Sequence, residues 1–360
     1  MSPPYSKLAA ETQGLKAGFF VRREKSSPLR CRALVRWRKV EAAAACRETR
    51  LIAESIASLN SQWGGTLVRF EQRYGGTVAI LDAAGGTAVV ALHGAQVLSF
   101  VPKGGREVLW LSPLAKLGTG KAVRGGIPIC WPWFGPAPDD PKKPAHGFVR
   151  AAPWRVLDCG NDPGPAFIRL GFDASGIDPA LWPHSAKAQI EIAVDESFLR
   201  VALETTNSGR TAFGLTQALH SYLAVGDIAE AMIEGLDGRR YIDQLAPGTR
   251  PVQSGPVRIG GEVDRIYQQS PDTVTVIDRA NARRITVAKS GSRSTVVWNP
   301  WEAKSARLGD MGADGYRRML CIETANAGED VVTLAPGARH RLVTTISGHF
   351  RAAGLTASLS

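Results

Sequence analysis

Beyond residue 66 the chain is a succession of short runs rich in β-branched residues, with glycine or proline between them. The runs are 78–81, 87–92, 96–101, 166–172, 188–194, 199–205, 213–224, 273–277, 284–288, 295–298, 318–323 and 340–346. No long segment after residue 66 shows a convincing helical period. Many strands at short spacing, with turn residues between them, are typical of large antiparallel sandwiches. The sequence therefore predicts an all-β fold.

With 360 residues the chain can form one large domain or two small ones. Because no internal repeat or low-complexity linker follows residue 66, we expect one β-sandwich domain at 66–350 and a tail at 351–360. Residues 1–65 are predicted to be a basic N-terminal extension outside the fold, poorly ordered or helical, with a helical stretch near 41–59. This extension is interpreted as a loose or artefactual leader, a targeting peptide or a partner-binding arm. Five acidic residues before position 60 count against targeting.

The net charge of +11 is concentrated in that extension. Residues 1–60 hold twelve Lys or Arg and five Asp or Glu, a net of +7, which leaves +4 for the remaining three hundred residues. A mildly positive body fits an anionic small-molecule substrate. Nucleic-acid binding would require a basic stripe with aromatic side chains on a folded face, and no recognisable motif for it is present. No run of eighteen apolar residues occurs, so we expect no transmembrane helix. The expected partners therefore include neither nucleic acid nor membrane.

The five cysteines, at positions 31, 46, 130, 159 and 321, are odd in number and widely spaced, with no Cys-x-x-Cys. This pattern argues against a disulfide framework and against a zinc site. Cys130 and Cys321 lie in apolar runs, where cysteine usually acts as a small core residue. The histidines show no His-x-His or His-Glu-x-x-His spacing, so no metal site is expected. A reducing compartment, the cytoplasm, is the predicted location.

Two arginines, one histidine and several aromatic residues are gathered in residues 123–150. Arg124 precedes two glycines and the run Ile-Pro-Ile-Cys-Trp-Pro-Trp-Phe, and His146 and Arg150 follow in a second block. Unpaired arginine is costly to bury, so such a set rarely builds a core. Guanidinium donors, glycines that let a backbone approach and aromatic walls are typical of a concave site for a small anion.

Seven blocks of the sequence carry a family resemblance. They are residues 123–135, 146–150, 219–222, 241–244, 262–267, 297–301 and 321–323, and the likeness spans roughly 66–349. In this order they resemble the D-hexose-6-phosphate mutarotases, or glucose-6-phosphate 1-epimerases, of the aldose-1-epimerase superfamily. The resemblance implies a β-supersandwich of the galactose-mutarotase type. It also implies interconversion of the α and β anomers of a hexose 6-phosphate by acid/base ring opening and reclosure at C1, without metal or organic cofactor.

By this resemblance His220 is the catalytic acid and Glu323 the catalytic base. An imidazole with a pKa near 6.5 can give and retake a proton at neutral pH. The alternative for His220 is a hydrogen-bonded histidine of the sheet. Glu323 follows an apolar run, where Glu is almost never buried without a partner, and its alternative is an exposed glutamate at a strand end. A loop is expected at 324–326, where some relatives have Pro-Gly.

The resemblance also implies substrate-binding residues: Arg124 and Arg150 for a phosphate, His146 for a sugar hydroxyl or the opened oxygen, and Asp243 for the substrate. The alternatives are surface salt bridges for the arginines, packing for His146 and a turn for Asp243. Ala145 stands where some relatives have glutamine. The aromatic residues that either line the site or belong to the core are Trp131, Trp133, Phe134, Trp298 and Trp301.

Three other functions stay open at this point. One is a mutarotase for an unphosphorylated aldose, and another is a non-catalytic sugar-phosphate-binding protein on the same fold, although such a protein would need neither His220 nor Glu323. A glycosidase needs two carboxylates flanking the scissile bond, which Asp243 and Glu323 could supply. The expected partner is a small-molecule hexose phosphate, and the expected oligomeric state is a monomer.

Overall fold

The computed structural model describes residues 54–160, 164–195 and 198–350. The chain divides into two units between Glu54 and Ser55, and the elements below belong to the second. Strands and their turns dominate this unit, and only two α-helices occur among the described residues. The predicted all-β class is therefore confirmed. No helix in the described part is both long and apolar enough to cross a membrane.

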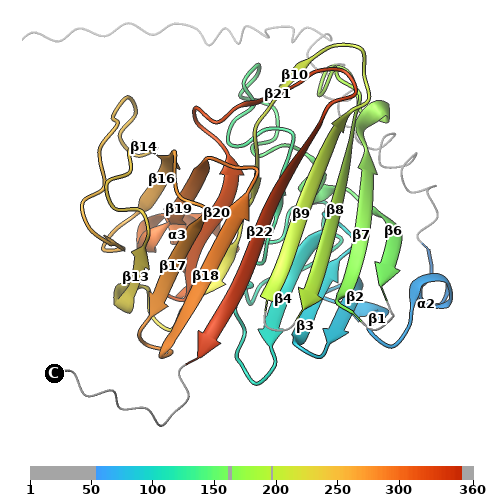
Figure 1. The fold of residues 1–360 in the computed structure, drawn as a ribbon, viewed down its shortest axis with the longest axis horizontal. Helices are drawn as coiled ribbons and strands as arrows, with labels where there is room; N and C mark the ends of the chain where they lie inside the picture. The colour runs from blue at the N-terminus through green and yellow to red at the C-terminus, as the bar shows by residue number, and fades with distance from the viewer. Residues whose placement is uncertain (1–53, 161–163, 196–197, 351–360) are drawn as a thin grey trace, which may run out of the picture. The chain divides into compact units, whose positions relative to one another are not determined.

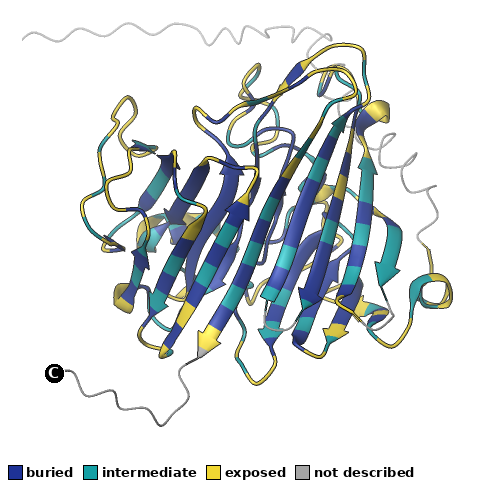
Figure 2. Cartoon of the chain, in the orientation of Figure 1, coloured by how far each residue is buried: buried dark blue, intermediate teal, exposed yellow. Residues whose placement is uncertain are grey.

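The largest sheet has nine strands, each antiparallel to its neighbours. Their spatial order is β15 (Val257–Arg258), β13 (Ala231–Glu234), β17 (Thr273–Asp278), β18 (Arg283–Ser290), β22 (Arg339–Phe350), β9 (Phe198–Asn207), β8 (Ala186–Asp195), β7 (Ala166–Asp173) and β6 (Arg155–Gly160). Buried and more exposed residues alternate along most of these strands (Figure 2). One face of the sheet therefore covers the core, while the other carries charged side chains.

A seven-stranded sheet holds the residues discussed below. Its order is β14 (Tyr241–Asp243), β16 (Val263–Gln268), β19 (Ser294–Asn299), β20 (Met319–Asn326), β11 (Gln217–Leu219) and β5 (Ile129–Cys130), with β12 (Tyr222–Ala224) also paired to β20. A four-stranded sheet contains β1 (Val68–Arg73), β2 (Gly76–Ala83), β3 (Gly86–Ala91) and β4 (Gln96–Pro102). A small ribbon pairs β10 (Phe213–Leu215) with β21 (Val332–Leu334).

The three large sheets form two layers (Figure 1). The four-stranded sheet lies behind one half of the nine-stranded sheet, where β2 contacts β7 and β8. The seven-stranded sheet lies behind the other half, where β20 contacts β22. The main apolar core, which includes Phe100, Trp131, Leu203 and Ile322, fills the space between the layers. Burial of this apolar area is the main stabilising contribution to the sandwich.

Three local expectations from sequence differ from the structure. The run 213–224, expected as one strand, is broken into β10, β11 and β12. Residues 324–326, expected as a loop, continue β20 because they pair with β11. Helix α3 (Trp301–Leu308) was not expected, since its eight residues are too short to show a clear period.

Of the helical stretch expected near 41–59, residues 41–53 lie outside the described residues. The described helix, α2 (Ile56–Trp63), begins at an N-cap whose Ser55 side chain accepts from the N–H of Ser58. Leu59 is buried against the core, and the side chain of Asn60 exchanges two hydrogen bonds with the backbone of Phe70. This part of the predicted extension is thus attached to β1, while the domain limits themselves stay a prediction.

Candidate active site

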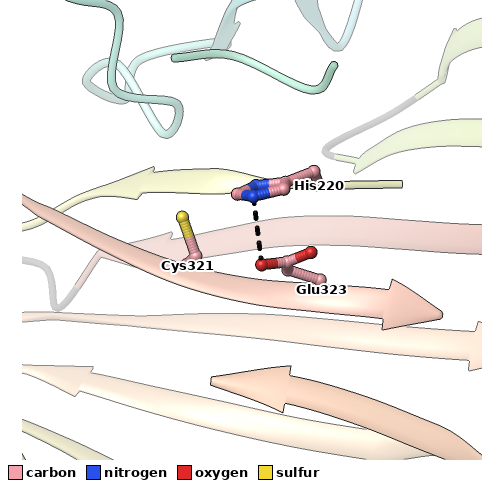
Figure 3. A group of neighbouring side chains, drawn as sticks. All are labelled: His220, Cys321 and Glu323. Carbon is pink, nitrogen blue, oxygen red and sulfur yellow. Dashed lines mark ion pairs between the residues drawn. The ribbon is translucent and has the colours of Figure 1, made fainter. Parts of the chain in front are cut away.

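The candidate site is built on β20, which runs through the middle of the seven-stranded sheet. Strand β19 pairs with one edge of β20, while β11 and β12 pair with the other, and all eight residues of β20 are buried. Because side chains alternate along a strand, Cys321 and Glu323 project from one face and Ile322 from the other, into the main core. Figure 3 shows the carboxylate of Glu323 directed toward His220, with the side chain of Cys321 on the same side of β20.

His220 reaches this face because it lies between two strands, β11 and β12, where the regular strand is interrupted. Its backbone N–H donates to the carbonyl of Pro128 at 3.0 Å. Its imidazole stacks on the ring of Tyr222, with centroids 4.8 Å apart and planes inclined by 14°. In this position Nε2 of His220 lies 3.3 Å from Oε1 of Glu323 (Figure 3). The fold therefore brings together two residues that are 103 positions apart in the sequence.

Both members of this pair are buried yet only partly satisfied. The exposed fraction is 8% for His220 and 1% for Glu323. Nδ1 of His220 and Oε2 of Glu323 are buried without a hydrogen-bond partner among the described residues. Buried polar atoms nearly always have partners, so two orphans side by side indicate a site that is completed by a ligand.

Burial and neighbouring charge move the two pKa values in opposite directions. Burial, followed by the field of Asp264, raises the pKa of Glu323 well above its usual range, although Arg150 opposes the shift. Burial, followed by the charges of His146, Arg150 and Arg124, lowers the pKa of His220 well below its usual range. Without a ligand the pair therefore favours its neutral forms, a carboxyl group beside an imidazole. It holds one proton that can move between two groups, as acid–base catalysis requires.

Arg124 is held on the same side of the sheet by two contacts. Its Nε donates to both carboxylate oxygens of Asp310, at 3.1 and 3.2 Å, and its Nη1 donates to the hydroxyl of Tyr222 at 3.0 Å. The side chain retains 24% exposure. Since Tyr222 also stacks on His220, the position of the guanidinium is tied to that of the imidazole.

The glycines after Arg124 serve the protein's own packing. Gly125 and Gly126 both have positive φ. A Cβ on Gly126 would lie 2.0 Å from the carbonyl oxygen of Val97, and one on Gly125 would lie 2.5 Å from that of Trp110. Only glycine allows this close approach, which fixes where Arg124 leaves the backbone.

His146 and Arg150 also act on His220. The rings of His146 and His220 are 5.8 Å apart. Nδ1 of His146 accepts from the N–H of Gly135 at 3.2 Å, so in the neutral ring the proton sits on Nε2. Burial and the charges of Arg150 and Arg124 lower the pKa of His146 to about 3. His146 is therefore a neutral donor, and its positive φ of 64° is a strained conformation of the kind found at functional sites.

Arg150 makes one side-chain hydrogen bond among the described residues. It belongs to the 3₁₀ turn η1 (Val149–Ala151), and its Nη2 donates to the carbonyl of Ala145 at 2.7 Å. Its charge acts on Glu323, His146 and His220. The position occupied by Ala145 thus contributes a backbone oxygen that orients Arg150.

Asp243 and Asp264 have different relations to the site. In the register of β14 and β16, Asp243 pairs with Arg265, whereas Asp264 pairs with Trp298 of β19. Asp264 therefore shares the face of Trp298 and Glu323, and Asp243 belongs to the opposite face. Oδ1 of Asp243 accepts the N–H of Leu245 at 3.0 Å, as in the turn aspartate considered from the sequence.

Asp264 is the residue that sequence reasoning missed. Burial is the main cause that raises the pKa of Asp264 to about 6. The positive charge of Lys304 opposes this shift, while the negative charges of Glu262 and Asp243 add to it. Nζ of Lys304 lies 3.9 Å from Oδ2 of Asp264 and 2.7 Å from Oε1 of Glu262. The residue types of 262–267 do not alternate between polar and apolar, so the only available signal was strand geometry, which places Asp264 opposite to Arg265.

The aromatic residues divide between core and site. Trp131 and Trp133 are buried in the main core, and their indole N–H groups donate to Thr205 and to the carbonyl of Pro144. Trp301 contacts Tyr316 near helix α3. Two rings flank the histidines instead: Trp298 is 6.0 Å from His220, and Phe134 is 5.0 Å from His146.

Comparison with known proteins agrees with this arrangement. The aldose 1-epimerase family model matches residues 77–347. A protein of Cenchrus ciliaris named "Putative glucose-6-phosphate 1-epimerase" is 36% identical over 260 residues, which cover 69% of this chain and 77% of the relative. A protein of Escherichia coli K12 with the same name is 37% identical over 237 residues, 66% of this chain and 78% of the relative.

A solved structure extends the agreement to three dimensions. The crystal structure of a "putative mutarotase" from Salmonella typhimurium aligns with a TM-score of 0.73 and 33% identity, over 79% of this chain and 94% of the other. The resemblance seen in the sequence blocks, and the mutarotase-type fold that it implied, are thereby confirmed. The chain belongs to the aldose 1-epimerase family of isomerases.

Proposed function

We propose that this chain interconverts the α and β anomers of a hexose 6-phosphate, with glucose 6-phosphate as the first candidate. The observation that carries the proposal is the His220–Glu323 pair, 3.3 Å apart and buried, with Arg124 and Arg150 near enough to shift its protonation. A monomeric enzyme in the cytoplasm is part of the proposal, as is the small-molecule substrate.

The reaction needs one proton acceptor and one proton donor, and the pair supplies both. Glu323, as carboxylate, takes the proton from the C1 hydroxyl while His220, as imidazolium, protonates the ring oxygen. The C1–O5 bond breaks and C1 becomes an aldehyde. After rotation about C1–C2, the O5 hydroxyl returns its proton to His220 and attacks the other face, while O1 recovers the proton from Glu323. The pair ends as it began, so no further acid, base or oxidant is consumed.

A bound phosphate supports the reactive protonation state. Arg124 and Arg150 are among the charges that lower the pKa of His220. A phosphate dianion beside them would cancel much of that field, so the imidazole would accept the proton of the pair more readily. The same anion would weaken the stabilisation of the Glu323 carboxylate by Arg150. The sugar hydroxyls that replace the His220–Glu323 contact must offset that loss through hydrogen bonds to the carboxylate.

Two further side chains are proposed to hold the sugar. His146 offers Nε2–H as a neutral donor, suited to an oxygen that develops charge as the ring opens. Asp264, on the face of Glu323, is proposed to bind a sugar hydroxyl, in place of the substrate contact that the resemblance implied for Asp243. Trp298 and Phe134 are proposed as apolar walls for the sugar ring.

A second candidate is mutarotation of a free aldose. It is favoured by the contacts of Arg124, since Asp310 and Tyr222 already occupy two of its donor groups. If those contacts persist with substrate bound, Arg124 positions Tyr222 and does not bind a phosphate. Substitution of each arginine separates the two candidates.

The test is anomer exchange measured by saturation-transfer NMR on hexoses with and without a 6-phosphate. Wild-type protein should accelerate exchange of the phosphorylated sugar most. His220→Ala and Glu323→Gln should each lower the rate by about 10²–10⁴-fold while the protein stays folded. Unchanged exchange in both variants would contradict the assigned acid and base. An equal loss on free and phosphorylated sugars in both Arg124→Ala and Arg150→Ala would refute the phosphate contact.

A further inference from the structure

The His220–Glu323 pair has a third potential metal donor beside it. A ligating atom from each of His220, Cys321 and Glu323 lies within 4.8 Å of the other two. Cys321 and Glu323 are two positions apart on β20, so their side chains leave the same face of the strand. Figure 3 shows the sulfur of Cys321 and the carboxylate of Glu323 on the side from which His220 approaches.

These donors form the ligand set of a zinc-type cation. Imidazole nitrogen, thiolate sulfur and carboxylate oxygen are the three protein ligands of zinc, with bonds of about 2.0–2.3 Å. Ligands in such a tetrahedron lie roughly 3.3–3.8 Å apart. Nε2 of His220 and Oε1 of Glu323 are already 3.3 Å apart. The sulfur of Cys321 lies within 4.8 Å of both and has to approach for direct ligation.

A second observation concerns the remaining polar atom of each residue, because the protein satisfies neither His220 nor Glu323 completely. Nδ1 of His220 and Oε2 of Glu323 are buried without hydrogen-bond partners among the described residues. Cys321 is a free thiol. The surrounding charge is mixed, since Asp264 favours a cation while Arg124 and Arg150 oppose it. This balance indicates reversible binding rather than a permanent structural ion.

We propose that His220, Cys321 and Glu323 form an inhibitory site for a thiophilic divalent cation of the zinc class. The three side chains supply three ligands, and the fourth position stays open to water. On binding, the thiol proton of Cys321 and the shared proton of the His220–Glu323 pair are released to solvent. The ion occupies both the acid and the base, so it excludes the sugar. This last step rests on the proposed function, whereas the metal binding does not.

Cobalt(II) is the probe for binding, because a thiolate ligand gives it a charge-transfer absorption band. The full chain is titrated with Co²⁺ and then with Zn²⁺, which should displace it. Wild type should bind one equivalent that Cys321→Ser lacks, together with the thiolate band. Cys159→Ser is the matched control, since Cys159 is a half-buried cysteine on β6, and it should keep that equivalent. The remaining cysteines are the same in every variant compared.

A second variant and a rate measurement keep the test decisive. Glu323→Gln should weaken cobalt binding at least tenfold even if Cys321→Ser does not fold, because loss of a direct ligand should cost no less than the roughly 10–100-fold known for outer-shell partners. The Zn²⁺ concentration for half-inhibition, with each variant referred to its own metal-free rate, should rise at least tenfold in Cys321→Ser. An unchanged cobalt band in Cys321→Ser, or in Glu323→Gln if Cys321→Ser does not fold, would overturn the proposal.

The sugar arm separates this inference from the proposed function. Glucose 6-phosphate should reduce cobalt occupancy of the wild-type protein. If cobalt binds through Cys321 but the sugar neither displaces it nor undergoes exchange, the metal site stands and the proposed function fails. If exchange is fast and Zn²⁺ inhibits wild type and Cys321→Ser at the same concentration, the function stands and the metal site fails.

Discussion

In the part of the chain that the structure describes, two buried acid–base pairs differ in how completely they are satisfied. Arg283 and Asp278 are 2.9 Å apart, with side chains 2% and 0% exposed. Arg283 also donates to the carbonyls of Glu107 and Ala224, and Asn281 donates to Asp278. His220 and Glu323 are buried to a similar degree, yet each retains an atom without a partner. We call Arg283–Asp278 the closed pair, because its hydrogen-bond partners come from the protein. We call His220–Glu323 the open pair, because each residue keeps a polar atom that a ligand can bind.

The difference shows what burial does in each place. At the β17–β18 hairpin, burial strengthens an ion pair whose hydrogen bonds are all internal, so the pair specifies the packing of that hairpin. On β20, burial without enough partners pushes both groups toward their neutral forms and leaves a mobile proton. The cost of desolvation is thus offset by hydrogen bonds at one site, while at the other it shifts the two pKa values and prepares the pair for chemistry.

The largest effect is expected from opening the closed pair. Arg283→Met leaves the Asp278 carboxylate buried and unpaired, so the free energy of unfolding should fall by about 3–5 kcal/mol. Urea denaturation measures this loss, while the rate per folded molecule should stay near that of wild type. Arg284→Met is the matched control, because the exposed Arg284–Glu234 pair should contribute only about 0–1 kcal/mol. Equal losses in the two variants would contradict the distinction between closed and exposed pairs.

A smaller effect of opposite sign is expected at the open pair. The folded-state pKa of Glu323 is raised, so wild-type stability should decline as pH rises from the unfolded value near 4.5 toward the folded one. Glu323→Gln removes this titration. Relative to wild type, its free energy of unfolding should therefore increase with pH by up to about 1.4 kcal/mol per pH unit across that window. Melting temperatures at pH 5 and pH 8 test this, and a pH-independent difference would show that Glu323 titrates normally.

The smallest effect is expected from Asp264, which lies beside the open pair. Its raised pKa of about 6 means that its charge changes near that pH. The pH profile of kcat/KM should therefore contain a step near pH 6 that Asp264→Asn removes. Asp243→Asn should keep the step, because Asp243 belongs to the opposite face of the sheet. If the step instead follows Asp243, the face assignment from the strand register fails.

Glu323 and Asp264 show why prediction of the site had a limit. The resemblance pointed to Glu323, but placed it at the end of a strand. The structure continues β20 through Asn326 because Gln217 of β11 pairs there, and nothing local in Thr-Ala-Asn indicates that partner. For Asp264, a strand over 262–267 would place its side chain on the face opposite to that of Arg265. Whether this is the face that carries Glu323 depends on the pairing of β16 with β19.

The sequence by itself determined the class of the fold, through its short β-branched runs and turn residues, and it placed the arginines, His220 and Glu323 in recognisable blocks. Only the tertiary structure decided that His220 and Glu323 touch and that Cys321 completes a donor set. It also decided that Asp264 rather than Asp243 shares their face. The physical reason is that period and turn chemistry are local properties of the chain. Strand pairing, burial and the pKa shifts that follow arise between segments far apart in sequence.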